Sequence, residues 1–176
     1  MEKRIICFGD SNTFGYCTRP DGIGYDRYDE NTRWPCVLQK YLGPEYLIFE
    51  EGVIGRNTSF DDPIREGMNG LKAVSSSVAA HEPVDLMIVM LGTNDVKERF
   101  QAGPDRIASG MERLLVKAAE TPGWRNGTPR ILVMSPPRIS REKNVEYHEK
   151  SSALAGLYAG IAEKHGWAFL DADAVG

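Results

Sequence analysis

The ten residues 86–95 read L-M-I-V-M-L-G-T-N-D and contain the strongest structural signal in this sequence. The first six are apolar without interruption, as expected for a strand that is covered on both faces. A glycine and three polar residues follow at once, at positions 92–95. This combination is typical of a parallel sheet between layers of helices, in which ligands bind beyond the carboxyl ends of the strands.

The rest of the sequence alternates short apolar runs with helical patterns. The other apolar runs suited to strands lie at 4–8, 46–51, 130–134 and 168–171. Apolar residues recur three or four positions apart within 34–42, 107–118 and 154–161, and more weakly within 68–80. The sequence therefore predicts an α/β fold of three layers, in which helices cover both faces of a five-stranded parallel sheet.

Length and composition favour one domain and argue against several classes of function. The 176 residues are 41% hydrophobic and have a net charge of −4, which gives no basic surface for nucleic acid. We expect no membrane helix, since no run reaches roughly 18 apolar residues, and no signal peptide, since the first apolar run is too short. Three cysteines without metal-like spacing favour a cytoplasmic protein that holds no metal.

Three of the predicted strands end in small polar turns. These turns are G-D-S-N-T at 9–13, E-E-G-V-I-G-R-N-T at 50–58 and G-T-N-D at 92–95. All three leave the same edge of a parallel sheet. Acyl transfer needs a nucleophile and hydrogen-bond donors for the oxyanion that forms. Ser11 could supply the hydroxyl and its own N–H, Gly55 a second N–H, and Asn94 a side-chain NH₂.

At these turns the chain resembles the SGNH (GDSL) family of esterases and lipases. The family's G-D-S, G-x-x-G and G-x-N-D blocks match residues 9–11, 52–55 and 92–95, in this order. The tract T-R-W-P at 32–35 and the pair Glu50-Glu51 are most similar to the arylesterase branch. The resemblance extends from about Ile5 to Asp171.

The resemblance implies a flavodoxin-like fold with strand order 2-1-3-4-5, no cofactor, and hydrolysis of small acyl, aryl or acetyl esters through an acyl-enzyme. It implies Ser11 as the nucleophile, with the Ser11 N–H, the Gly55 N–H and the Asn94 side chain as the oxyanion hole. The supporting residues are Gly9, Asp10, Gly92 and Asp95. We expect Asp10 to hold its turn through backbone N–H groups and Asp95 to be structural. A homo-oligomer is a further expectation, because oligomers occur in the arylesterase branch.

The family's last block, D-x-x-H, is absent from this sequence. That block supplies the general base and the aspartate that orients it, in a loop after the fifth strand. Here the residues at that place are F-L-D-A-D-A-V-G, 169–176. We therefore expect residues 1–176 to form one hydrolase-type domain without this loop and the terminal helix, through truncation rather than natural loss. Weak or absent turnover is expected, because a serine hydroxyl is a poor nucleophile without a base.

The three histidines offer no clear replacement for the base. His81 and His165 precede strands and should lie at the amino edge of the sheet, away from the three turns. His148 follows the fourth strand on the side of the active edge, so it is the one candidate for a substitute base. The interpretation that we prefer for His148 is a solvated residue on the first turn of the last helix. The general base is left unassigned.

Other residues near the predicted site keep two interpretations. Arg33 and Trp34 could line the substrate pocket, or pack on the core at the start of a helix. Pro136 follows the fourth strand in a stiff loop and could shape the acyl pocket. We interpret Gly52 mainly as a residue that adopts a positive φ. The insertion 16–31 is long for a loop and could cover the site.

Two other functions compete with the esterase hypothesis. The run S-N-T-F-G at 11–15 has a flavodoxin-like pattern of hydroxyls and glycine, which would suit the phosphate of FMN. Gly55 and the turn 92–95 have no role in that hypothesis. The second rival is a non-catalytic binding relative, which the missing acid–base pair supports.

Overall fold

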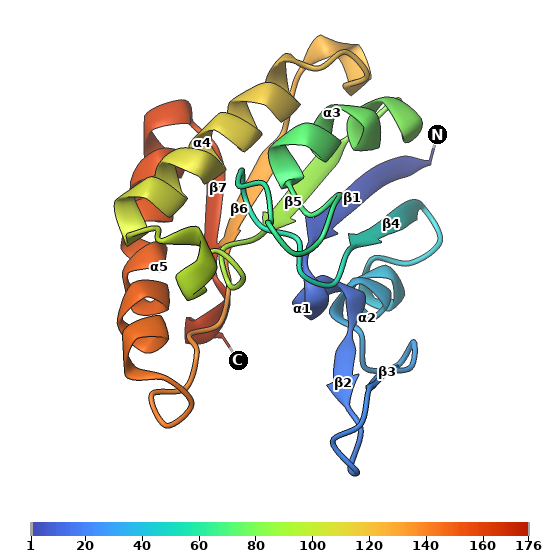
Figure 1. Cartoon of the computed structure of the whole chain (residues 1–176). Helices are drawn as coiled ribbons and strands as arrows, with labels where there is room; N and C mark the ends of the chain where they lie inside the picture. Colours follow the sequence, from blue (N-terminus) through green and yellow to red (C-terminus); the bar gives the residue numbers. More distant parts are fainter. Residues whose placement is uncertain (1, 176) are drawn as a thin grey trace.

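The fold is built on a five-stranded parallel sheet (Figure 1). The computed structural model describes residues 2–175. The strands of the sheet are β1 (Lys3–Gly9), β4 (Tyr46–Gly52), β5 (Leu86–Met90), β6 (Ile131–Ser135) and β7 (Ala168–Asp171). Their spatial order is β4-β1-β5-β6-β7, and all neighbours pair in parallel. When these five strands are numbered by their order in the chain, their spatial order is 2-1-3-4-5. This confirms the predicted α/β, flavodoxin-like class. The labels in the figures are higher after β1 because β2 and β3 belong to a separate hairpin.

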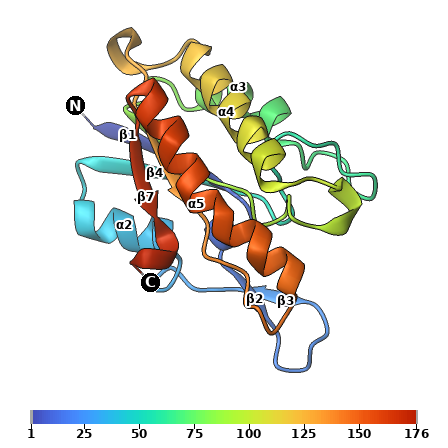
Figure 2. The same cartoon turned by 90° about the vertical axis from the view of Figure 1, so that its left-hand side faces the viewer.

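Helices cover both faces of this sheet, as Figure 2 shows. The main helices are α2 (Trp34–Leu42), α3 (Gly70–Ala80), α4 (Pro104–Glu120) and α5 (Val145–His165). Helices α3, α4 and α5 pack on the face that includes Phe8 and Val89. Helix α2 packs on the opposite face, against Cys7 and Ile88. Because successive strand residues point to opposite faces, both sets must be apolar, which explains the uninterrupted run at 86–91.

The helix ends follow local sequence signals. Helix α2 has Pro35 in its first turn and ends before Gly43, whose φ is +80°. The Asn69 side chain caps α3 by accepting a backbone hydrogen bond, so this helix begins at Gly70, two residues later than predicted. The described residues also include the short 3₁₀ helices η1 (Glu98–Phe100), η2 (Arg125–Gly127) and η3 (Ala172–Ala174). Within residues 2–175, every helix is too short or too polar to cross a membrane.

The segment 16–31 was expected to be a long loop, and this prediction was wrong in part. It contains an antiparallel hairpin of β2 (Tyr16–Thr18) and β3 (Tyr25–Arg27), which projects from the body of the molecule in Figure 1. The rings of Tyr16 and Tyr25 stack across the hairpin, with centroids 5.2 Å apart. The Glu50 carboxylate on β4 accepts a hydrogen bond of 3.0 Å from Arg27 and so ties the hairpin to the sheet.

Candidate active site

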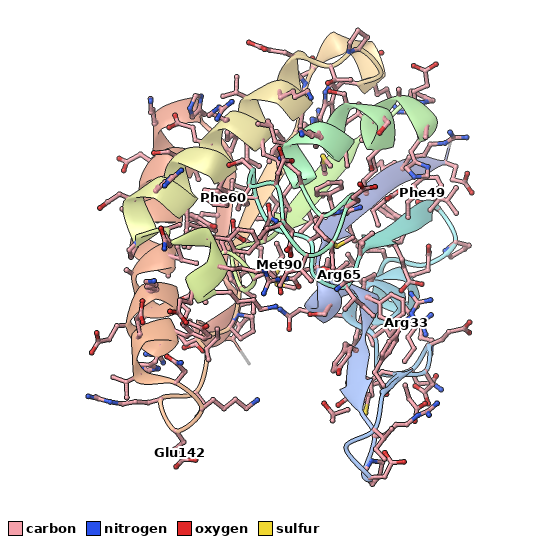
Figure 3. All side chains as sticks on the ribbon, viewed as in Figure 1. Arg33, Phe49, Phe60, Arg65, Met90 and Glu142 are labelled. Carbon is pink, nitrogen blue, oxygen red and sulfur yellow. The ribbon has the colours of Figure 1, made fainter. Side chains whose placement is uncertain are left out.

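The three polar turns of the sequence meet at the carboxyl ends of β1, β4 and β5. The pairing register places Gly9 beside both Gly52 and Met90, and Met90 marks this edge in Figure 3. The Asn94 side chain joins the turns. Its Nδ2 atom donates to the Arg56 carbonyl at 2.9 Å and lies 3.4 Å from the Asp10 carboxylate. The site residues predicted from the three turns are therefore brought together.

Ser11 opens the four-residue helix α1 (Ser11–Phe14), directly after β1. The buried Asp10 caps this helix, because its Oδ1 atom accepts the Asn12 N–H at 2.9 Å. Asp10 thus holds the turn through a backbone N–H, as expected. Ser11 is half-buried, and no group within residues 2–175 forms a hydrogen bond with its hydroxyl. The hydroxyl is free to meet a ligand.

The backbone N–H groups of Ser11 and Gly55 are among those at this edge that have no acceptor in the described part of the chain. Gly55 is buried and has a φ of +92°, a conformation that favours glycine. Buried N–H groups are nearly always paired, so an unpaired one at a strand end is a candidate donor to a ligand. With the Asn94 NH₂ group, these are the three donors that the sequence suggested.

Gly52 allows the second turn to approach α1, and Gly9 allows the first turn to fold back tightly on itself. A Cβ atom on Gly52 would lie 2.3 Å from the Phe14 nitrogen, and one on Gly9 would lie 2.1 Å from the Thr13 hydroxyl. Gly52 does not have a positive φ, so our interpretation of this residue was wrong. Glycine is needed there because the backbone of α1 packs directly on the end of β4.

Lys97 fixes the orientation of the Asn94 side chain. Its ammonium group donates to Asn94 Oδ1 at 2.7 Å, which leaves the NH₂ group facing Arg56 and Asp10. Burial lowers the pKa of Lys97, and the neighbouring Arg99 lowers it further. Lys97 is a site residue that was not predicted, although a lysine three positions after the asparagine of a turn is a usable signal in the sequence.

Two buried carboxyl groups lie behind the turns. Burial raises the pKa of Asp10 to about 6 and that of Asp95 to about 6. Asp95 Oδ1 accepts from the Thr58 N–H at 2.9 Å and from the Thr58 hydroxyl at 2.5 Å, whereas its Oδ2 has no partner in the described residues. Asp95 therefore joins the second turn to the third. Gly92, with a φ of +127°, starts this third turn close to the Tyr158 hydroxyl.

Arg56 is a further buried residue that the sequence analysis did not single out. Its guanidinium lies over the Phe8 ring at 4.0 Å and donates to the carbonyls of Gly9 and Glu51. Burial lowers its pKa to about 10. Its carbonyl accepts from Asn94, so Arg56 contacts all three strand ends. The feature of the sequence that could have indicated this role is the position of the arginine directly after Gly55 of the second turn.

None of the three histidines contacts Ser11 in the described part of the chain. His148 lies in the first turn of α5, half-buried, with Nδ1 2.8 Å from the Ile139 carbonyl. His165 is 2.6 Å from Glu112. His81 ends α3, and the carbonyl of the next residue, Glu82, accepts from Arg4 at the amino end of β1, as expected. The His81 ring stacks on Phe49, and its Nε2 reaches Glu51 of β4 at 2.8 Å. These contacts with Phe49 and Glu51 hold the imidazole ring of His81 against β4.

The residues expected to form the pocket wall have structural contacts. Arg33 is buried, and its guanidinium donates to both carboxylate oxygens of Glu50 at 2.9 and 3.2 Å. Trp34 packs with α2 on the smaller core cluster, so the core interpretation of both residues is the one the contacts favour. Pro136 is buried beside Gly92 and lines a cavity of about 220 Å³ between the loop after β6, the end of β7 and α5. No cluster of metal-ligating side chains occurs within residues 2–175.

Comparison with known proteins gives a consistent result. Residues 7–176 match the family model described as GDSL-like lipase/acylhydrolase. An aryl esterase from M. smegmatis is 36% identical, with a TM-score of 0.89 over 98% of this chain and 85% of that one. A carbohydrate acetylesterase from Sinorhizobium meliloti is 34% identical, with the same TM-score and the same coverage of both chains. No curated protein gave a match.

Proposed function

This chain belongs to the GDSL-like lipase/acylhydrolase family, and we propose that it hydrolyses small carboxylic esters with Ser11 as the nucleophile. The observation that supports this role is the pair of hydrogen-bond contacts of Asn94. One joins it to the turn of Gly55 and the other to the turn of Ser11. A nucleophile and three oxyanion donors thus lie within one hydrogen-bonded group.

In the proposed reaction, Ser11 Oγ attacks the ester carbonyl and the oxygen becomes an oxyanion. The N–H groups of Ser11 and Gly55 donate to that oxygen, and so does the Asn94 NH₂ group, with the N–H that becomes free when its 3.4 Å contact with Asp10 is given up. Collapse of this intermediate releases the alcohol and leaves an acyl group on Ser11, which water then removes. Asp10 and Gly9 hold the nucleophile turn, and Gly92 and Asp95 hold the turn of Asn94.

The attack also requires a base that accepts the Ser11 proton. No histidine of residues 2–175 contacts this hydroxyl, and the sequence contains no D-x-x-H. We therefore propose that the 176 residues form one domain that turns esters over slowly. An aryl or acetyl ester is the proposed substrate, because the solved neighbours are an aryl esterase and a carbohydrate acetylesterase. A cytoplasmic location and self-association stay predictions.

The FMN hypothesis has no support from the geometry. A phosphate at the start of α1 would face the Asp10 carboxylate, which already accepts the Asn12 N–H. Two negative groups at one helix start repel each other. The family match also favours an esterase. A non-catalytic binding protein is the rival that experiment must separate.

A fluorophosphonate probe tests the proposal, because it reacts with activated serines and needs no turnover. We expect slow labelling of Ser11 alone, mapped by peptide mass spectrometry, and none in Ser11→Ala. Asn94→Ala should slow the labelling by roughly 10²-fold, as loss of an oxyanion donor does. A protein that is folded and unlabelled after prolonged incubation would favour the non-catalytic relative. Labelling of another serine would reject Ser11 as the nucleophile.

A further inference from the structure

Three cations gather at one side of the proposed oxyanion site. They are Arg65, Lys97 and Arg99. Beyond the effect of burial, Arg99 and Arg65 lower the pKa of Lys97, whereas the carboxylates of Asp10 and Asp62 raise it, so the surroundings of Lys97 contain charges of both signs. Like charges repel, and such a group is stable only where carboxylates or a bound anion balance it.

Two of these cations already have partners. Arg99 donates to both oxygens of Asp62 at 2.7 and 3.1 Å, and the Asp62 side chain is fully buried. Lys97 donates to the neutral amide of Asn94, and the carboxylate with the largest effect on it is that of the buried Asp10, which raises the pKa of Lys97. A nearby carboxylate, Asp61, is occupied with Lys72 at 2.8 Å. The positive charge that is left at this rim belongs to Arg65.

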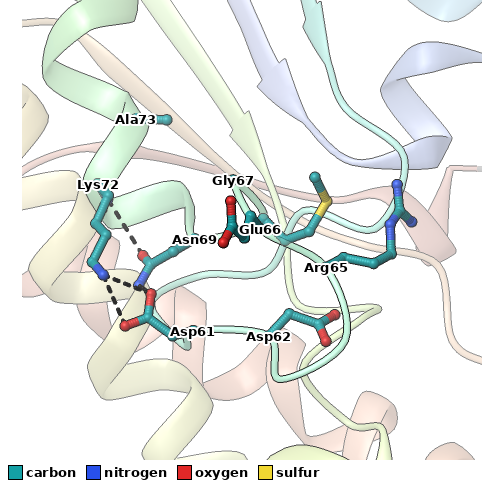
Figure 4. A pocket seen from close by; sticks show the side chains of 9 residues that line it. Asp61, Asp62, Arg65, Glu66, Gly67, Asn69, Lys72 and Ala73 are labelled. Carbon is teal, nitrogen blue, oxygen red and sulfur yellow. Dashed lines mark hydrogen bonds and ion pairs between the residues drawn. The ribbon is translucent and has the colours of Figure 1, made fainter.

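The Arg65 guanidinium has no hydrogen-bond, ionic or ring partner within residues 2–175. It belongs to the exposed loop between β4 and α3, which lines a cavity of about 420 Å³. Figure 4 shows the side chain directed away from Asp61, Asp62 and Glu66. Its Nη1 atom lies 2.6 Å from the point where a Cβ on Gly55 would be. Arg65 therefore borders the residue whose N–H is a proposed oxyanion donor.

A guanidinium is a planar fork of donors that fits a carboxylate through two parallel hydrogen bonds. An arginine without a carboxylate, next to unpaired N–H groups, suits a ligand that is itself anionic. We propose that this site takes esters that carry a carboxylate group, and that Arg65 is the residue that selects them. This inference rests on the proposed function, because it concerns the substrate of the same site.

Succinate binding tests the inference without requiring turnover. The 176-residue protein is titrated with succinate and with its neutral diester, dimethyl succinate, at low ionic strength, while NMR follows the Gly55 amide and the Asn94 side chain. We expect succinate to bind at least about tenfold more tightly and to shift both signals. Arg65→Gln should weaken succinate binding about tenfold, and Arg65→Lys should weaken it less, because the charge remains but the fork is lost.

The matched control is Arg113→Gln, which removes an exposed arginine of α4 and should leave succinate binding unchanged. Absence of succinate binding, equal affinity for the neutral diester, or an equal loss in both arginine variants would overturn the inference. These results would not affect Ser11, because fluorophosphonate labelling measures its role separately. Conversely, Arg65-dependent succinate binding without Ser11 labelling would support the anionic ligand and reject the esterase mechanism.

Discussion

Asn94 is the residue on which the geometry of the site depends. Its amide has two ends, and only the NH₂ end can stabilise an oxyanion. Lys97 determines which end faces the site, since an ammonium group can only donate and therefore binds the amide oxygen. A charge-assisted hydrogen bond also makes the opposite NH₂ protons better donors.

Replacing Lys97 tests this positioning role. We expect Lys97→Met to lower the rate of Ser11 labelling by about tenfold, and Lys97→Arg to restore much of it, because arginine can donate to the same oxygen. The side-chain NMR signal of Asn94 should move in the methionine variant. Lys117→Met is the control, since that lysine donates to the Leu71 carbonyl on α3, away from the turns. Equal labelling rates in all three variants and the wild type would contradict the role of Lys97.

The buried carboxyl group of Asp95 makes a prediction about pH. Its pKa is raised from an ordinary value of 3.8 to about 6 in the folded protein, so the native state holds the proton more tightly than the unfolded chain. Its contribution to the free energy of unfolding therefore falls as pH rises from about 4 to about 6. Relative to wild type, Asp95→Asn should gain stability over this range by at most about 3 kcal/mol. Urea unfolding at pH 4.5 and pH 7.5 measures this, and a pH-independent difference would refute it.

At the level of elements, the site is made by the close packing of α1 on the end of β4. Gly52 permits this approach, and Gly9 permits the first turn to fold back so that Thr13 packs on the end of β1. Asp95 then joins the second turn to the third through Thr58. The position of Ser11 is thus set by contacts between elements rather than by its own short helix.

Gly52→Ala should disturb this packing strongly. The added Cβ would lie 2.3 Å from the Phe14 nitrogen, a backbone atom that cannot move without shifting α1. We expect a loss of about 3 kcal/mol in the free energy of unfolding, as for other overpacked sites. Gly160→Ala on α5 is the matched control, because its surroundings are open, and it should gain up to about 1 kcal/mol. Similar values for the two variants in chemical denaturation would contradict the packing argument.

For the molecule as a whole, the sequence predicts the sheet and its active edge well. Uninterrupted apolar runs such as 86–91 and the glycines of the turns are local signals, and they are enough to place the strands. The role of Arg56 could not be predicted in the same way, because the Gly9 carbonyl that it contacts belongs to another strand, which only the order of the sheet brings near. Lys97 lies three positions from its partner Asn94, so its signal was local and was not recognised. The hairpin was missed because its strands are three residues long and its aromatic pair lies nine positions apart.

The histidines also differ in how far the local sequence predicts their positions. The position of His148 on α5 follows from helical spacing. The contact of His81 with Glu51 depends on how α3 lies across β4, and nothing local in the sequence predicts it. Within residues 2–175, the three histidines contact Glu51, the Ile139 carbonyl and Glu112, and none of them contacts the Ser11 hydroxyl.

Chemical rescue by an added base is the most direct test of the central claim, that Ser11 is a nucleophile aligned with a formed oxyanion hole. Imidazole in solution can accept the Ser11 proton in place of a histidine side chain. We expect hydrolysis of p-nitrophenyl acetate by the wild type, corrected for the reaction of imidazole alone, to rise with imidazole concentration, and that of Ser11→Ala to stay at background. Identical imidazole dependence in the two proteins would contradict the account.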